Sequence, residues 1–303
     1  KRKMMTDGAW PVLRRYEGEH LARISLPLGG IGTGTVGLGG RGQLRDWEVM
    51  NRPAKGFIPN HTFFALYAKP EGKRSVTRAL EGALLPQEFE GAFGSPAPNH
   101  GLPRFRECMF ATAYPFGQVR LADPDVPVDV RIEAFNPLVP GDADASGIPM
   151  AVIRFVLNNK TADPVETSVC GNLENIVGTD GVDGKAVKNR NTFRRGTEGW
   201  QGIVMASQGV PADSERWGTM ALVTDGEQVS CRTAWPVMRW GNALLDFWDD
   251  FSSDGAVEER EAPDADAPTA SLATKATIGP RKTRTLTFLL TWCFPNRMTW
   301  TPV

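Results

Sequence analysis

The sequence has few of the side chains that build metal sites. Its three histidines lie far apart and none neighbours a cysteine: they are His20, His61 and His100. Metal sites need His, Cys or carboxylate side chains clustered at ligand spacing. A GxSxG nucleophile elbow, the local mark of many serine hydrolases, is also missing. The histidine pattern therefore argues against zinc, and serine hydrolase chemistry has no local support.

Cysteine is scarce as well, and no CxxC pair occurs. The four cysteines are Cys108, Cys170, Cys231 and Cys293. Such isolated cysteines favour buried thiols in a reducing compartment such as the cytoplasm, and two disulfides are the alternative. Because residue 1 is not Met, an exported chain with a removed leader stays open as a second localisation.

Long apolar runs and an excess charge of one sign are both missing. No apolar run approaches the roughly 18 to 20 residues of a membrane span. The formal net charge of −1 gives no electrostatic footprint for nucleic acid or an anionic membrane. We therefore predict neither a transmembrane segment nor a nucleic-acid partner.

Glycine is what the sequence has in abundance, above all between Gly29 and Gly42, where eight of the fourteen residues are glycine. Gly32–Gly37 matches G-x-G-x-x-G, but a dinucleotide site needs a helix to begin inside the glycines. Further glycines follow, and each costs roughly 1 kcal/mol in a helix interior. We predict instead two short strands, 24–28 and 43–50, joined by glycines that permit close backbone approach or positive φ.

The rest of the pattern predicts an all-β fold, a large two-sheet antiparallel sandwich. Apolar and polar residues alternate along 128–134, as in a strand with one buried face, whereas 150–157 is more continuously apolar and predicts a strand covered on both faces. Further strands are expected at 62–68, 165–170, 202–206, 219–224, 229–234, 270–278 and 284–292.

One segment has helical rather than strand periodicity. Apolar residues recur at helical spacing through 237–251, which predicts a short amphipathic helix. The acidic residues at 246–266 are expected to lie largely in a solvated loop. We divide the chain into an N-terminal arm, 1–18, and a single sandwich domain, 19–301.

Four segments, taken in order, resemble one known family. The first is PLGGIGTGTVGLGGRGQLRDWEVMNRP, and the others lie at 61–67, 135–149 and 289–297. Together they are similar to the N-terminal domain of glycoside hydrolase family 116, which contains β-glucosidases and non-lysosomal, bile-acid-type glucosylceramidases. The resemblance covers roughly residues 19 to 297.

The resemblance implies a non-catalytic domain. In the family, the nucleophile glutamate and the acid/base aspartate belong to a C-terminal (α/α)6 barrel, which this sequence does not reach. No catalytic residue carries over, so we expect this chain alone to be inactive. The implied role is to pack on that catalytic domain, stabilise it and shape its entrance. The implied reaction is retaining hydrolysis of a β-glucoside, which needs two carboxyl groups and no cofactor.

Two other functions remain as alternatives. A free-standing carbohydrate-binding module would expose two or more aromatic side chains in a line and bind glucans without cleaving them. A chain that hydrolyses glycosides alone would need a close, exposed pair of carboxyl groups.

The candidate site residues follow the glycine segment. Those expected at a domain interface or at the rim of a sugar cleft are Asp46, Trp47, Glu48, Asn51, Arg52, Asn60 and His61. Arg52 suits a partner carboxylate, and Trp47 suits stacking on a partner or a β-glucoside. The structural alternative is that Trp47 fills the core of this sandwich while Arg52 caps a loop carbonyl.

Overall fold

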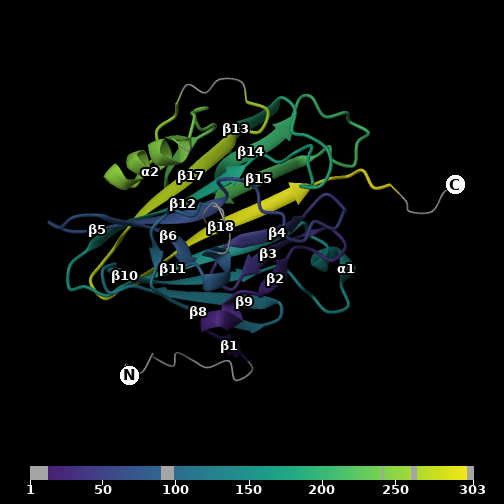
Figure 1. Cartoon of the computed structure of the whole chain (residues 1–303). Coiled ribbons are helices and arrows are strands. Elements are labelled where there is room, and N and C mark those ends of the chain that lie inside the picture. Colours follow the sequence, from purple (N-terminus) through teal and green to yellow (C-terminus); the bar gives the residue numbers. More distant parts are fainter. Residues whose placement is uncertain (1–12, 90–98, 241, 261–264, 299–303) are drawn as a thin grey trace.

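The computed structural model describes residues 13–89, 99–240, 242–260 and 265–298. Strands dominate these residues and form sheets of nine, six and three strands, antiparallel except for one short parallel pair. Figure 1 labels the elements along the chain. The prediction of an all-β antiparallel sandwich is confirmed, and a small third sheet accompanies the two large ones.

The nine-stranded sheet has the order β1-β8-β9-β10-β11-β18-β15-β14-β13. Its strands are β1 (Arg14–Tyr16), β8 (Glu107–Ala113), β9 (Phe116–Ala122), β10 (Val128–Phe135), β11 (Met150–Asn159), β13 (Asn189–Arg195), β14 (Gln201–Ser207), β15 (Thr219–Thr224) and β18 (Thr283–Cys293). Strand β1, within the predicted N-terminal arm, pairs with β8 at one edge. The predicted boundary between arm and domain stays a prediction.

The six-stranded sheet has the order β16-β17-β12-β5-β6-β7. Its strands are β5 (Phe63–Pro70), β6 (Val76–Gly82), β7 (Arg104–Phe105), β12 (Val165–Glu174), β16 (Gln228–Arg232) and β17 (Thr269–Ile278). Nearly every residue of β5 and β12 is buried, because one face packs inside the sandwich and the other lies under a helix.

The glycine segment builds the third sheet. Its strands are β2 (Ser25–Leu28), β3 (Thr35–Gly39) and β4 (Leu44–Glu48). The prediction of two strands joined by a glycine linker was incomplete, because the glycines themselves form the central strand β3. A side chain at Gly34, where φ is +87°, would place its Cβ 2.5 Å from the Glu48 carbonyl oxygen. Glycine is therefore required for this close backbone approach.

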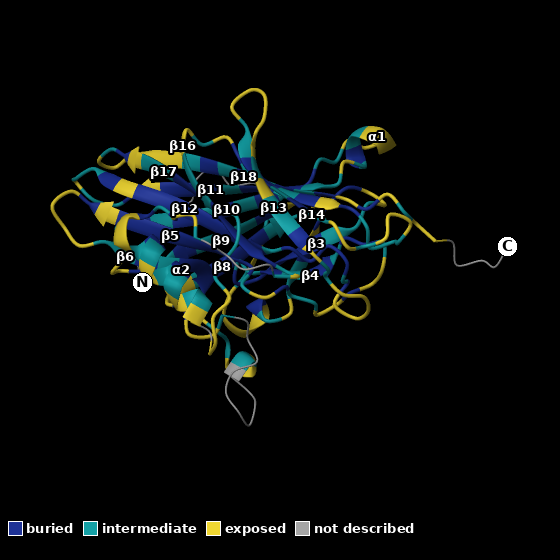
Figure 2. Ribbon diagram, turned by 90° about the horizontal axis from the view of Figure 1, so that it is seen from above, coloured by how far each residue is buried: buried dark blue, intermediate teal, exposed yellow. Residues whose placement is uncertain are grey.

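The main hydrophobic core lies between the large sheets and extends beneath the small one. Buried residues concentrate along the central strands, whereas most exposed residues lie in loops and turns (Figure 2). Strand β10 alternates as predicted, with Val130 and Ile132 buried and Arg131 and Glu133 partly exposed. Strand β11 was predicted to be covered on both faces, but it alternates along 150–155, where Met150, Val152 and Arg154 are only partly buried.

A second core lies between the six-stranded sheet and helix α2 (Asn242–Asp254). The helix was predicted from residue 237, but it begins at Asn242. Trp240 has a positive φ of 62° and is 94% exposed, so it lies outside the helix and away from the core. Phe247 and Phe251, one helical turn apart, carry the packing instead.

The remaining elements are short. They are η1 (Gly18–Leu21), η2 (Pro86–Phe89) and α1 (Ala143–Ser146). Asp142 caps α1, since its side chain accepts a hydrogen bond from the Ala145 backbone N–H at 2.9 Å. Within the described ranges, none of the helices is both long and apolar enough to cross a membrane. All four cysteines are free thiols.

Candidate interdomain interface

Several loops gather where strands β10, β12, β14 and β18 end and where β5, β11 and β15 begin. The strand pairings place these ends together, since Phe63 pairs with Asn172 and Thr219 pairs with Cys293. We call this region the loop end; it comprises residues 29–34, 49–62, 136–149, 175–188, 208–218 and 294–298. Figure 1 shows α1 on the same side of the molecule as the C-terminal segment.

The three consecutive candidates on β4 have different environments. Trp47 is 1% exposed and belongs to the main core, so its ring is not available to a partner or a sugar. The Asp46 carboxylate is buried and accepts a hydrogen bond from the Gly56 backbone N–H at 2.6 Å. Glu48 accepts from the Ala54 N–H and forms an ion pair with Lys55 at 2.5 Å. These two carboxylates therefore hold the loop that follows β4.

Asn51 and Arg52 continue into the loop end and contact its C-terminal segment. Asn51 has a φ of 60°, a conformation that asparagine tolerates better than most residues. Its side-chain amide donates to the carbonyl oxygens of Phe294 and Asn296 at 3.2 and 3.4 Å. Arg52 donates through two nitrogens to one oxygen of Glu215, at 2.6 and 3.0 Å. Arg52 therefore binds a carboxylate of this chain rather than a loop carbonyl.

A second ion pair lies beside the first. Arg216 donates to Asp180 at 2.9 Å, and the Asp180 carboxylate also accepts from the backbone N–H groups of Val182 and Asp183. Burial alone would raise the pKa of Asp180, but these N–H groups and the Arg216 guanidinium together hold it below its ordinary value. The hydrogen bond from Arg52 is the main cause that lowers the pKa of Glu215. Both carboxyl groups are thus poorly suited to act as a general acid.

Between these groups lies a cleft of about 310 Å³. Its lining residues are Asn51, Arg52, Pro53, Asp180, Val182, Asp183, Glu215 and Met298. Asn51 and Arg52 are among the predicted site residues, whereas none of the acidic residues that line this cleft is. Glu215 lies 163 residues from Arg52 in sequence, and no local pattern marks it.

Asn60 and His61 lie beside strand β5, apart from the Arg52 group. The backbone N–H and side chain of Asn60 both donate to Glu174, at 2.8 and 3.3 Å. The His61 ring stacks on Trp235, with the ring centroids 5.1 Å apart. Burial lowers the pKa of His61, and a hydrogen bond with Asn99 opposes that effect only in part. The imidazole is therefore neutral at pH 7 and acts as a packing group.

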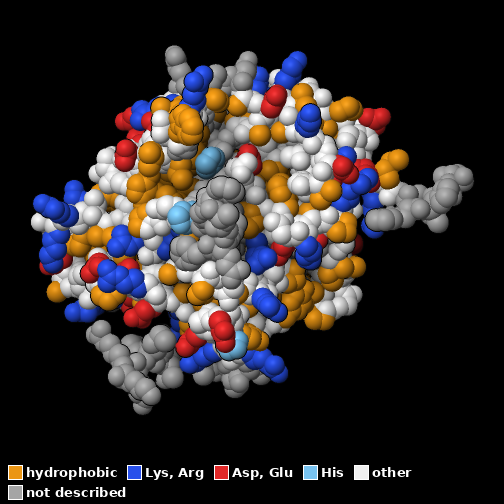
Figure 3. All heavy atoms as spheres, in the orientation of Figure 1, with side chains coloured by type: hydrophobic (Ala, Val, Ile, Leu, Met, Phe, Trp, Pro, Cys, Tyr) orange, Lys and Arg blue, Asp and Glu red, His pale blue; other side chains and the backbone are white. Residues whose placement is uncertain are grey.

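Exposed apolar side chains form two groups among the described residues, one at the loop end and one at 237–245, where α2 begins. The loop-end group has five members on four separate loops: Ile31, Val139, Ile148, Val182 and Met298. The Ile31 backbone N–H donates to the Ser146 carbonyl at 2.8 Å, so the β2–β3 turn and α1 lie side by side. Figure 3 shows hydrophobic side chains reaching the surface on this side of the molecule. No group of three or more potential metal ligands occurs among the described residues.

Two solved structures resemble the chain weakly. A candidate kojibiose phosphorylase from the human microbiome is 8% identical over 95% of this chain and 27% of its own, with a TM-score of 0.35. A polysaccharide lyase is 11% identical over 94% of this chain and 33% of its own, with a TM-score of 0.40. The chain thus spans about a third or less of either protein. Because both TM-scores are low, we conclude nothing about this chain from them.

A protein-family model matches most of the chain and assigns it to a family. The family model described as "beta-glucosidase 2, glycosyl-hydrolase family 116 N-term" matches residues 25–301. The match includes the glycine-built sheet, α2 and all strands of the two large sheets except β1. The chain therefore belongs to the family of N-terminal domains of glycoside hydrolase family 116.

Proposed function

We propose that this chain packs through its loop end on a C-terminal catalytic domain and shapes the entrance to that domain's active site. Membership in an N-terminal domain family implies such a companion domain. The whole enzyme would be a retaining β-glucosidase or glucosylceramidase, with both catalytic carboxyl groups on the companion.

The five exposed apolar side chains on four neighbouring loops of the loop end are the observation that carries this proposal. Val182 and Met298 are 76% and 64% exposed and flank the Arg52–Glu215 ion pair. An apolar patch with a polar rim is typical of surfaces that bind another protein. Met298, in the segment that follows β18, lies in the same patch.

The polar groups of the loop end suit positioning rather than catalysis. Their side chains are already held by partners within this chain, as in the Arg52–Glu215 and Arg216–Asp180 pairs. Prepaired charges of this kind give an interface its orientation and specificity more than its affinity. The proposed role therefore requires no carboxyl group of this chain to transfer a proton.

Hydrolysis of an aryl β-glucoside tests the proposal. We expect no hydrolysis by this chain alone and hydrolysis when the C-terminal catalytic domain is supplied as a separate polypeptide. Val182→Asp should weaken association of the two by tenfold or more, since a charge would enter an apolar contact. Val237→Asp is the matched control, because Val237 is also an exposed valine, at 65%, but lies before α2.

Calorimetric titration of the catalytic domain with each variant measures the association. Equal weakening by both variants, or none by Val182→Asp, would place the interface elsewhere. Glucoside hydrolysis by this chain alone would contradict the non-catalytic role.

The alternative is a carbohydrate-binding module. The large exposed aromatic side chains of the described residues are Tyr114, Phe116 and Trp240. Tyr114 lies in the β8–β9 turn and Phe116 begins β9, whereas Trp240 precedes α2, so Trp240 comes from a different part of the chain than the other two. Titration with soluble β-glucans distinguishes the alternatives, because the interdomain role predicts no binding of neutral glucans by this chain.

A further inference from the structure

The second group of exposed apolar side chains lies where the chain enters α2. Its members are Val237, Met238 and Trp240 before the helix and Leu245 in the first turn of the helix. We call these four residues the Trp240 surface. Helix α2 lies on the outer side of the six-stranded sheet, and part of its length is exposed (Figure 2). The Trp240 surface shares no residue with the loop end.

Backbone geometry holds Trp240 in solvent. The Asn242 backbone N–H donates to the Arg239 carbonyl oxygen at 3.2 Å, which closes a turn with Trp240 at its tip. The φ of Trp240 is +62°, a conformation that bulky side chains rarely adopt and that costs stability. Because the side chain is 94% exposed, contacts within the chain offset little of that cost. Strain without a structural return indicates a function outside the fold.

The core beneath this turn is already filled. Trp235, Phe247 and Phe251 stack in succession, with ring centroids 4.9 and 5.7 Å apart, and all three are buried. The buried Arg232 binds two aspartates of α2 and fixes the helix over the sheet. Trp240 therefore cannot fold back without displacing a stacked ring, and a rigid base presents it to solvent.

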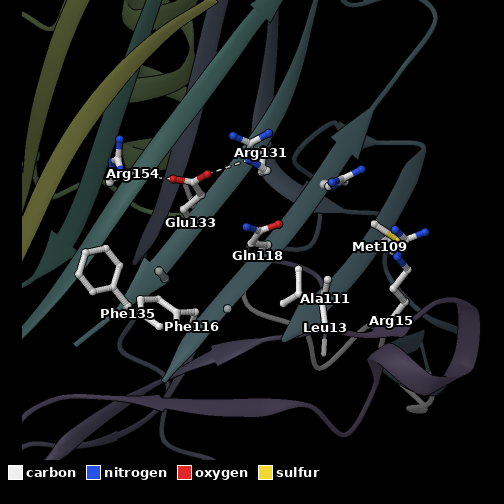
Figure 4. A pocket seen from close by; sticks show the side chains of 13 residues that line it. Leu13, Arg15, Met109, Ala111, Phe116, Gln118, Arg131, Glu133, Phe135 and Arg154 are labelled. Atoms are coloured by element: carbon white, nitrogen blue, oxygen red, sulfur yellow. Dashed lines mark hydrogen bonds and ion pairs between the residues drawn. The ribbon is translucent and has the colours of Figure 1, made fainter. Parts of the chain in front are cut away.

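Charge is sparse on this part of the molecule. Within 233–245 the only charged residue of the sequence is Arg239, and it is exposed. Arginines elsewhere are paired: in the cleft over β8 to β11, Arg131 and Arg154 share the Glu133 carboxylate (Figure 4). No ion pair holds Arg239 in the described part of the chain. The surface is thus apolar with one available cation.

A phospholipid bilayer matches this combination, because its apolar interior is bounded by a layer of negatively charged phosphate groups. Tryptophan is enriched at membrane–water interfaces, where its ring is in apolar surroundings and its indole N–H still finds a polar partner. An arginine beside it can lay its apolar stem along the lipid and keep its guanidinium among the phosphates. Both residue types stand next to each other here, at positions 239 and 240.

From this arrangement we propose that the Trp240 surface binds the surface of a phospholipid bilayer. Trp240, Met238 and Leu245 enter the boundary between headgroups and acyl chains. Arg239 binds lipid phosphate. Asp249, one helical turn beyond Leu245, is exposed and stays in water, so only the start of α2 inserts. The inference does not depend on the interdomain role of the loop end.

Co-sedimentation of the full 303-residue chain with phosphatidylcholine vesicles tests the proposal. We expect binding at millimolar lipid or below, because insertion of apolar side chains supplies most of the affinity. Salt screens charges and should therefore change the binding little. Phosphatidylserine in the vesicles should strengthen binding severalfold at most, since Arg239 is the one cation of the surface. If neither kind of vesicle carries the chain down at millimolar lipid, the proposal is wrong.

Trp240→Asn tests the central side chain. It should weaken vesicle binding tenfold or more, because the largest inserted ring is lost. Asparagine tolerates a positive φ better than tryptophan, so the variant should melt at the same temperature or higher. Lost binding with undiminished stability excludes a merely structural role. Tyr114→Asn is the matched control, since Tyr114 is an exposed aromatic residue of the β8–β9 turn. Equal effects of the two variants would overturn the proposal.

Phosphatidylcholine with brominated acyl chains measures insertion, because bromine quenches only a tryptophan that it contacts. Part of the wild-type fluorescence should be quenched, and that part should be missing in Trp240→Phe, which keeps an aromatic ring and should still bind. Quenching that persists in Trp240→Phe would mean that another part of the chain inserts. Ultracentrifugation without lipid gives the last outcome: a dimer that Trp240→Asn dissociates would show that the surface binds a second copy of this chain instead.

Discussion

The α2 region and the loop end both contain arginine–carboxylate ion pairs, but these are buried under α2 and exposed at the loop end. Each contains arginine–carboxylate pairs beside exposed apolar residues. Under α2, the Arg232 side chain is fully buried and binds Asp246 and Asp250, both at 2.6 Å, so the helix is fixed over the sheet. At the loop end, Arg52 remains 42% exposed while it binds Glu215. One surface is closed within the chain, and the other is left open.

The difference shows that a part of the sandwich becomes core only where another element of the chain covers it. Helix α2 supplies Phe247, which stacks on Trp235 with the centroids 4.9 Å apart. In the described loop end, no element does the same for Val182 or Met298. Buried pairs of this type are costly to break, whereas exposed pairs contribute little to stability. Substitutions in the two regions should therefore differ sharply.

Phe247→Ala should have the largest effect. Removing a fully buried ring from the second core should lower the free energy of unfolding by about 3 to 5 kcal/mol, because a cavity replaces its contacts. Urea denaturation measures the loss. Ile31→Ala at the loop end is the comparison and should stay within about 0.5 kcal/mol, since Ile31 is exposed. Similar small losses in both variants would mean that α2 covers no true core.

Arg232→Met should have the next largest effect. It removes the cation from between Asp246 and Asp250, which then retain the more distant Arg260, at 3.8 and 3.7 Å, and a 2.9 Å hydrogen bond from the Glu258 backbone N–H to Asp250. We expect a loss of about 2 to 4 kcal/mol in the free energy of unfolding, below the full range for breaking a buried pair, because Asp246 is partly solvated. Arg52→Met should leave the urea midpoint unchanged. A comparable loss in both variants would remove the distinction between closed and open surfaces.

The smallest effect should be a pH dependence at the loop end. The pKa of Asp180 is lower in the folded chain than its ordinary value of 3.8. Its ionised form therefore stabilises the fold above that value, and the contribution is lost as pH falls through the folded pKa. Urea denaturation at several pH values should show Asp180→Asn less stable than wild type at pH 7, with a gap that shrinks below about pH 4. A gap that does not change with pH would contradict the contribution of the charge.

Local pattern was sufficient for much of the fold. The alternation along β10 and the apolar run of β5 were both visible in the sequence, because period two and continuous burial leave direct marks in residue order. Strand β3 was missed because glycine has a low strand propensity. Glycine is required at position 34, just before β3, only because the Glu48 backbone lies so close, and residue order does not show that contact. The helix was placed too early because Trp240 continued an apolar period that the backbone interrupts.

For the candidate site, the sequence supplied Asn51 and Arg52 but not Glu215, Asp180 or Arg216. The partners come from loops more than a hundred residues away, and charged loop residues carry no signature of their eventual neighbours.

The sequence by itself determined the family and the all-β class, because these depend on residue type and local spacing. Only the tertiary structure decided that Trp47 fills the core, which carboxylates hold Arg52, and which strand faces stay open. Those outcomes depend on strand register and on which element covers which sheet, and both are set by contacts between residues distant in the chain.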